Sequence, residues 1–142
     1  MRTEPSQSPV EDRLLHGHIT KQILGAFYQV HHELGFGFVE SVYSAALAMV
    51  LTELGLRVER EVPIAVYFRG ARVGSFTADK IVESAVVVEQ KAVHSLPPIW
   101  EAQLLNYLRS TKLEVGLLLN FGPRATFKRL VWTNDRKLLG SS

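Results

Sequence analysis

The sequence feature that most constrains the fold is a run of three valines at positions 86–88 that leads directly to Glu89 and, two residues later, to Lys91. β-Branched residues favour strands, and a strand that is apolar at consecutive positions must be covered on both of its faces. Residues 85–93 are therefore predicted to form an inner strand of a sheet. Two charged side chains at the end of such a strand need a physical reason to be there.

Upstream of this strand, the apolar residues recur at helical spacing. Residues 11–34 carry one apolar stripe, and a second helix is predicted over residues 39–54. Gly35 and Gly55 follow these two segments directly, and glycine is the residue that most often ends a helix. The stripe of the first helix consists of Leu15, Ile19, Ile23, Ala26, Phe27, Val30 and Leu34.

Beyond Leu56 the spacing changes to the alternation that is typical of strands. Pro63 has no backbone N–H to donate, so it predicts an edge strand or a bulge. Turns are expected at Arg69 and Gly70, and again near Ser84. The expected elements are strands over residues 57–68, 73–82 and 85–93, a helix over residues 99–110, and strands over residues 116–121 and 125–132. This order of helices and strands predicts an α/β fold.

The composition is that of one ordinary globular domain. The chain has 142 residues, of which 46% are hydrophobic and 21% are charged, and it contains no cysteine. Disulfides, thiolate metal sites and a cysteine nucleophile are thereby excluded. Residues 1–10 are polar and contain proline, so we expect a flexible N-terminal tail followed by a single domain over residues 11–142. No apolar stretch suits a signal peptide or a membrane span, and we expect a cytoplasmic protein without a membrane partner.

Positive charge is concentrated in the C-terminal third of the chain. Residues 109–142 contain seven basic and two acidic side chains, although the whole chain carries a net charge of only +2. A basic segment can bind a polyanion such as nucleic acid. A solvated surface rich in lysine and arginine gives the same pattern, so charge alone does not choose between the two.

Asp79, Glu89 and Lys91 are the strongest candidates for chemistry. Glu89 and Lys91 are two residues apart on the predicted strand, so both side chains leave the same face of the sheet. Asp79 lies on the preceding strand of the same hairpin. It shares that face only if it pairs with Glu89, which requires an odd number of loop residues centred on Ser84. A two-residue turn would instead place Asp79 opposite Val88, on the other face.

Two carboxylates held close on rigid strands repel each other unless a cation joins them. Magnesium fits such a pair because it takes oxygen ligands and often uses only one or two carboxylates together with substrate phosphate oxygens. Lys91 beside it could orient an attacking water or stabilise the charged phosphate. The same three residues are also consistent with an ordinary surface ion pair between neighbouring strands.

A longer pattern surrounds these three residues. The segment from Gly37 to Tyr43 reads GFVESVY and matches the motif GxxExxY. It is followed in order by ADKIVE, VVVEQKAV, EAQLLNYLRST and GLLLNFG. From about residue 19 to residue 132 the chain therefore resembles the GxxExxY family of the PD-(D/E)XK nuclease superfamily. The resemblance implies a restriction-endonuclease-like core, αβββαβ, with a mixed central sheet flanked by helices.

The resemblance also implies a function, namely phosphodiester hydrolysis in DNA or RNA with Mg²⁺ or Mn²⁺ as cofactor. Carried over position by position, it implies three metal-binding carboxylates, a lysine that assists the water, and two helix residues of a QxxxY motif that position the site. These residues are Glu40, Asp79 and Glu89, then Lys91, then Gln103 and Tyr107. Nucleic acid is the expected partner, and a homodimer is one way for so small a domain to grip a duplex. A binding or regulatory module that does not cleave is the alternative.

Several of these residues have a second interpretation. Glu40 suits a helix N-terminus, where the helix dipole favours negative charge, and we favour a structural role for Tyr43 in the core. The chain also departs from the family at Lys80 and Gln90, where apolar residues are usual. If Asp79 pairs with Glu89, these two polar residues are neighbours on the opposite face of the sheet. Either they compensate each other by bonding, or that face is partly wet.

Overall fold

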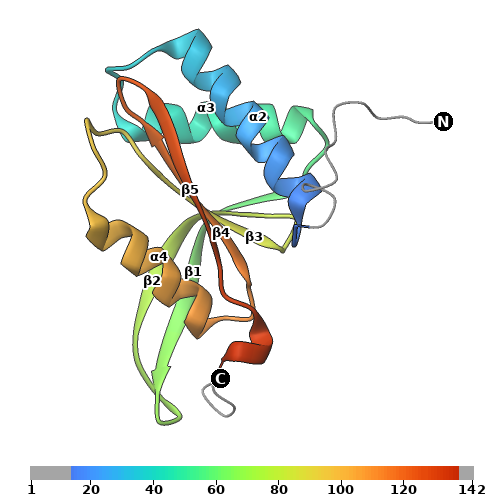
Figure 1. Ribbon diagram of the computed structural model, residues 1–142, viewed down its shortest axis with the longest axis vertical. Coiled ribbons are helices and arrows are strands. Elements are labelled where there is room, and N and C mark those ends of the chain that lie inside the picture. The colour runs from blue at the N-terminus through green and yellow to red at the C-terminus, as the bar shows by residue number, and fades with distance from the viewer. Residues whose placement is uncertain (1–13, 138–142) are drawn as a thin grey trace, which may run out of the picture.

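The computed structural model describes residues 14–137, which form one five-stranded sheet with helices on both faces (Figure 1). The strand order is β1-β2-β3-β4-β5. The elements are α2 (Gly17–Leu34), α3 (Glu40–Glu53), β1 (Val58–Phe68), β2 (Ala71–Val82), β3 (Val86–Lys91), α4 (Pro98–Ser110), β4 (Val115–Phe121), β5 (Ala125–Val131) and a 3-10 turn, η1 (Asn134–Arg136).

The sheet is mixed. β3 and β4 run parallel, whereas every other pair of neighbouring strands is antiparallel. A parallel pair needs a crossover connection, and α4 supplies it. The predicted α/β fold, with a mixed sheet flanked by helices and the restriction-endonuclease-like element order, is confirmed. Pro63 lies in β1 at the edge of the sheet, one of the two positions predicted for a residue that has no N–H to donate.

Most element boundaries agree with the sequence prediction to within a few residues, but the helix expected over residues 11–34 begins only at Gly17, after a turn that includes residues 14–16. The strand expected over residues 85–93 is shorter and ends at Lys91, and the strand expected from residue 73 begins at Ala71. The tail expected over residues 1–10 lies outside the described residues. Within residues 14–137, no helix combines the length and apolar character that crossing a membrane would need.

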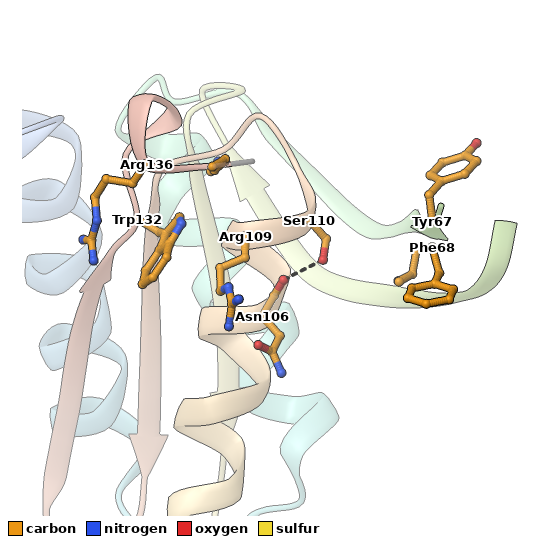
Figure 2. A pocket seen from close by; sticks show the side chains of 9 residues that line it. Tyr67, Phe68, Asn106, Arg109, Ser110, Trp132 and Arg136 are labelled. Carbon is orange, nitrogen blue, oxygen red and sulfur yellow. Dashed lines mark hydrogen bonds between the residues drawn. The ribbon is translucent and has the colours of Figure 1, made fainter. Parts of the chain in front are cut away.

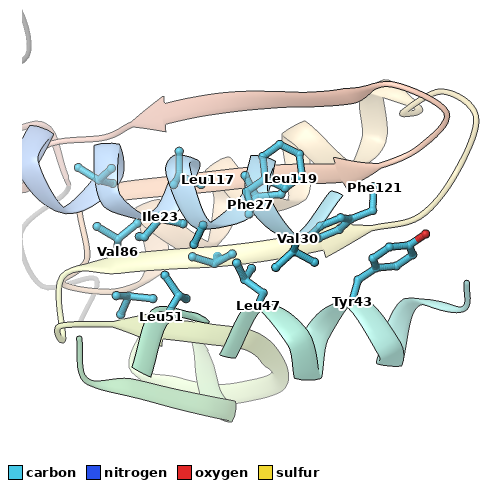
Figure 3. Close-up of a cluster of buried hydrophobic side chains, with 14 residues drawn as sticks. Ile23, Phe27, Val30, Tyr43, Leu47, Leu51, Val86, Leu117, Leu119 and Phe121 are labelled. Atoms are coloured by element: carbon cyan, nitrogen blue, oxygen red, sulfur yellow. The ribbon is translucent and has the colours of Figure 1, made fainter. Parts of the chain in front are cut away.

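The three valines of β3 are covered on both faces, as predicted. Val86 and Val88 point into a cluster formed with α2 and α3 (Figure 3), and Val87 points into a second cluster with Leu104 and Leu108 of α4. All three valines have no exposed surface. Burying each such side chain contributes about 1.5–3 kcal/mol, which fixes β3 at the centre of the sheet.

Tyr43 anchors the loop between α2 and α3. Its side chain is fully buried, and its ring stacks on Phe121 with the centroids 4.5 Å apart (Figure 3). Its hydroxyl donates a hydrogen bond to Gly35 O and accepts one from Phe38 N at 3.2 Å. The structural role favoured for Tyr43 is confirmed. Gly37 lies in the turn before Glu40 and has a φ of 124°, a conformation that suits glycine.

Lys80 and Gln90 form the compensated pair that their positions suggested. Lys80 has no exposed surface, and its ammonium donates to Gln90 Oε1 and to Ser44 Oγ of α3, each at 2.9 Å. Burial is the main reason why the pKa of Lys80 falls to about 8. The polar pair therefore links β2 and β3 to α3 on the face opposite Asp79 and Glu89.

Tyr43→Phe should lower the free energy of unfolding by about 1–2 kcal/mol, because Gly35 O and Phe38 N would lose their buried partner while the ring stays in place. Urea denaturation measures the change. Tyr28→Phe is the matched control, since Tyr28 is exposed and its hydroxyl has no hydrogen bond within residues 14–137. Equal effects of the two substitutions would contradict the anchoring role.

Candidate functional site

The hairpin between β2 and β3 has the register that the acidic pair requires. Lys80 pairs with Val88 and Val82 with Val86, so the loop has three residues and is centred on Ser84. Glu83 and Ser84 both adopt positive φ, near 55° and 52°, which lets the chain reverse within that loop. The predicted odd-numbered loop is confirmed. Asp79 and Glu89 therefore lie side by side on the face covered by α4.

Asp79 and Glu89 bind each other's strands where the ladder of paired residues between β2 and β3 ends, at Lys80 and Val88. Asp79 N donates to Glu89 Oε2 at 3.0 Å, and Gln90 N donates to Asp79 Oδ2 at 2.8 Å. Each carboxylate thus uses one oxygen to hold the neighbouring strand. The other oxygen of each, Oδ1 and Oε1, has no hydrogen-bond donor among residues 14–137 and remains available for a ligand.

The pKa of Glu89 reflects its burial beside a second carboxylate. Burial, followed by the negative charge of Asp79, raises the pKa of Glu89 to about 7. The bond from Asp79 N and the charge of Lys91 act in the opposite direction but do not cancel the rise. The negative charge of the two partly buried carboxylates is thus not fully balanced by nearby positive charge. A bound divalent cation would supply the missing positive charge.

Lys91 belongs to the same cluster but forms no direct ion pair within residues 14–137. Its ammonium lies over the ring of Trp100, 4.5 Å from the centroid, while its charge lowers the pKa of Glu89 and of Glu40. The simple surface ion pair that the sequence also allowed is not formed. A cation–π contact holds the ammonium near the acidic pair without neutralising either carboxylate.

Trp100 was not among the residues predicted from the sequence. It lies in the first turn of α4, and the spacing of Trp100, Gln103 and Tyr107 places all three along one side of that helix. This spacing, beside a buried strand that ends in lysine, is the signal that could have identified it.

The two helix residues of the QxxxY motif are placed differently. Tyr107 stacks on Phe76 of β2, with centroids 3.4 Å apart and planes 7° apart. Burial, followed by the charges of Glu89 and Asp79, raises the pKa of Tyr107, so its hydroxyl is within electrostatic range of the acidic pair. Gln103 is exposed one turn earlier and makes no hydrogen bond to the acidic pair within the described residues. Its role stays a prediction.

Glu40 is the first residue of α3 and is exposed. Its pKa is raised, mainly by partial burial and also by Asp79, while Lys91 lowers it. The charges of Asp79 and Lys91 therefore act on its carboxylate. Its position in the first turn also benefits from the helix dipole, so the structural interpretation of this residue holds as well.

The donor set fits a magnesium-like ion in part. Within residues 14–137 there is no ready-made group of three His, Asp or Glu side chains that could hold a metal, so Glu40 does not complete a three-carboxylate set. Mg²⁺ needs no such set, because one or two carboxylates, waters and substrate phosphate oxygens are its usual ligands. The free oxygens of Asp79 and Glu89, together with the raised pKa of Glu89, fit that requirement.

Stability should depend on pH through Glu89. A carboxyl whose pKa is higher in the folded protein stabilises the fold below its unfolded pKa, near 4.5, and this contribution is lost as the pH rises through about 7. Glu89→Gln, which keeps an acceptor for Asp79 N, should thus raise the free energy of unfolding at about pH 8 by roughly 2–3 kcal/mol.

Urea denaturation in EDTA at several pH values tests this effect. The advantage of Glu89→Gln should shrink steadily as the pH falls from about 7, where the glutamate in the folded protein becomes protonated, towards 4.5, its pKa in the unfolded chain. Glu53→Gln, at the exposed end of α3, serves as the control and should show no such trend. If the free energies of unfolding of Glu89→Gln and wild type differed by the same amount at every pH, the raised pKa of Glu89 would be contradicted.

Comparison with known proteins gives a consistent result. Residues 17–130 match the family model of the PD-(D/E)XK nuclease superfamily. The crystal structure of SSO0001 superposes with a TM-score of 0.52 at 24% identity, and the match covers 88% of this chain and 62% of that one, a likeness that shows the fold. No curated protein sequence matches significantly. Because the family match spans most of the chain, the protein belongs to the PD-(D/E)XK nuclease superfamily.

Proposed function

We propose that the protein is a metal-dependent nuclease that hydrolyses phosphodiester bonds in DNA or RNA, and that within its superfamily it belongs to the GxxExxY family. The observation that carries the proposal is the pair formed by Asp79 and Glu89. Each carboxylate is fixed by a backbone N–H and keeps one oxygen to which no donor among residues 14–137 bonds. The motif from Gly37 to Tyr43 supports the finer family assignment.

In this proposal Asp79 and Glu89 hold Mg²⁺ or Mn²⁺, and the carboxylate of Glu40 acts on the ion through a bound water rather than as a direct third ligand. The ion would supply an activated water and neutralise charge on the phosphate. The ammonium of Lys91 orients that water and stabilises the negative charge that grows on the phosphate oxygens. Water adds to phosphorus, the bond to the leaving oxygen breaks, and the proton lost by the water returns to that oxygen through solvent.

In the same mechanism, Tyr107 and Gln103 position the substrate. Stacking on Phe76 holds the Tyr107 ring rigid, so its hydroxyl can donate to a phosphate oxygen. Gln103, one turn earlier and exposed, would contact the bound substrate or a ligand water. Trp100 would fix the ammonium of Lys91 on the substrate side of the sheet.

A module that binds nucleic acid without cleaving it is the second candidate. The observation that favours it is the absence, within residues 14–137, of a group of three side chains prepared for a metal. A site with two carboxylates depends on substrate oxygens to complete the coordination of the ion, and such a site can bind without turning over.

Cleavage of labelled single- and double-stranded DNA and RNA in Mn²⁺ tests the proposal. Lys91→Ala should lower the rate by about 100-fold or more, which is the usual contribution of a group that acts on the reacting water or the charged phosphate. Lys128→Ala removes the same charge from an exposed position on β5 and should leave the rate nearly unchanged.

The possible results separate the candidates. Cleavage that survives Lys91→Ala would point to another site or to a contaminating nuclease and would contradict the proposal. Binding of nucleic acid without any cleavage in Mg²⁺ or Mn²⁺ would favour the second candidate.

Thermal melting tests metal binding without reference to activity. An ion that binds only the folded protein raises the melting temperature, and the rise grows as the ion concentration exceeds the Kd. Mn²⁺ should therefore stabilise the wild-type protein, and Asp79→Asn should lose most of this shift because one carboxylate ligand becomes a neutral amide. An equal shift in both proteins would place the bound ion elsewhere.

A further inference from the structure

A groove of about 500 Å³ lies at the C-terminal end of α4, apart from the acidic pair (Figure 2). The end of β1 borders it on one side, and the segment that follows β5 borders it on the other. Its volume is within the range of ligand-binding clefts. The lining residues are Val66, Tyr67, Phe68, Asn106, Arg109, Ser110, Trp132, Arg136 and Lys137.

The charge of the groove is positive, since three of its lining residues are basic and none is acidic. Lys137 has a structural task, because its ammonium donates to Thr111 O, Leu113 O and Asn134 Oδ1. Arg109 and Arg136 are different. Within residues 14–137 their guanidinium groups make no hydrogen bond or ion pair and lie over the Trp132 ring, at 5.1 Å and 4.0 Å from its centroid.

One indole ring thus orients two guanidinium groups, while no acceptor in the described part of the chain uses their N–H donors. A guanidinium in this state is well suited to phosphate, which it can bind with two parallel hydrogen bonds. The contact with Trp132 restricts the rotamers beforehand and so reduces the entropy lost on binding.

The opposite wall of the groove presents aromatic rings to solvent. Tyr67 is 49% exposed and Phe68 is 58% exposed, and the Arg69 guanidinium lies 4.9 Å from the Phe68 centroid. Exposed aromatic side chains beside unpaired cations combine stacking surfaces for bases with charges for phosphates. Figure 2 shows Tyr67 and Phe68 on the hairpin across from Arg109 and Trp132.

The groove continues the row of residues on α4 that leads from the acidic pair. Asn106 lies one turn beyond Gln103, and Ser110 one turn beyond Tyr107, so these four residues share one side of the helix. With a rise of about 1.5 Å per residue, Ser110 is only about 4–5 Å further along the axis than Tyr107. An extended chain laid along α4 would pass from the groove to the acidic pair.

We infer that this groove binds single-stranded nucleic acid, with bases stacked on Tyr67 and Phe68 and phosphates held by Arg109 and Arg136. A duplex is disfavoured because its bases already stack on each other and cannot offer their faces to protein rings. The inference rests on the proposed nuclease function and adds the substrate class, a flexible single strand that is guided along α4.

Fluorescence anisotropy in EDTA tests binding without cleavage. The probes are a short labelled oligothymidylate, an oligouridylate of equal length and a blunt DNA duplex. The wild-type protein should bind one or both single strands more tightly than the duplex, and the tighter single strand identifies the preferred sugar. The double variant Tyr67→Ala/Phe68→Ala should raise the Kd for the preferred strand by about tenfold or more.

Arg136→Ala tests the phosphate contact separately. It should weaken binding and reduce the slope of log Kd against log salt concentration by about 0.7, the value for one lost phosphate contact on a single strand. Arg124→Ala removes the same charge from the exposed turn between β4 and β5, and Tyr28→Ala removes an exposed ring from α2. Both controls should stay within about twofold of wild type at one salt concentration, a change smaller than the loss of one stacked base.

Tighter binding of the duplex, no detectable binding of either single strand, or equal affinities for groove variants and controls would each overturn the inference. Circular dichroism and melting confirm that the variants fold. Because binding is measured without turnover, the two proposals can fail separately. Groove variants that bind normally and still cleave would overturn the groove inference and leave the nuclease proposal intact. Single-strand binding without any cleavage would contradict the nuclease proposal alone.

Discussion

The site depends on the two hydrogen bonds by which Asp79 and Glu89 hold each other's strands. They occur where the ladder between β2 and β3 ends, so the carboxylates replace backbone pairing at the point where the strands separate. These two hydrogen bonds keep two carboxylates of like charge close together on rigid strands. The pKa of Glu89 rises to about 7 through burial and, second to that, through the negative charge of Asp79.

The rest of the fold can be understood as what holds this pair in place. The valines of β3 are buried on both faces, so the strand that carries Glu89 and Lys91 cannot slide. On the opposite face, Lys80 bonds to Gln90 and to Ser44, and this ties the same two strands to α3. A buried lysine is costly unless it is well bonded. Here its partners join the elements that carry Asp79, Glu89 and Glu40.

Much of the fold could be predicted from the sequence because it depends on local spacing. The change from helical to alternating apolar spacing predicted the order of elements. The spacing left two registers open for the β2–β3 hairpin, and the structure has the one centred on Ser84. Strand ends were less accurate, since residues 92 and 93 could have continued β3 on propensity alone. Side-chain placement was harder to predict. Trp100 beneath Lys91 and the exposed position of Gln103 depend on how α4 lies across the sheet, which spacing within the helix does not determine.

The central claim is that Asp79 and Glu89 are a binding site for a hard divalent cation, and a crystal soaked in Mn²⁺ tests it most directly. The account predicts an anomalous peak between the two carboxylates, at about 2.1–2.2 Å from Asp79 Oδ1 and Glu89 Oε1, as expected for a small hard cation with oxygen ligands. A peak elsewhere, or none at a saturating concentration of Mn²⁺ and at a pH where Glu89 is ionised, would contradict it.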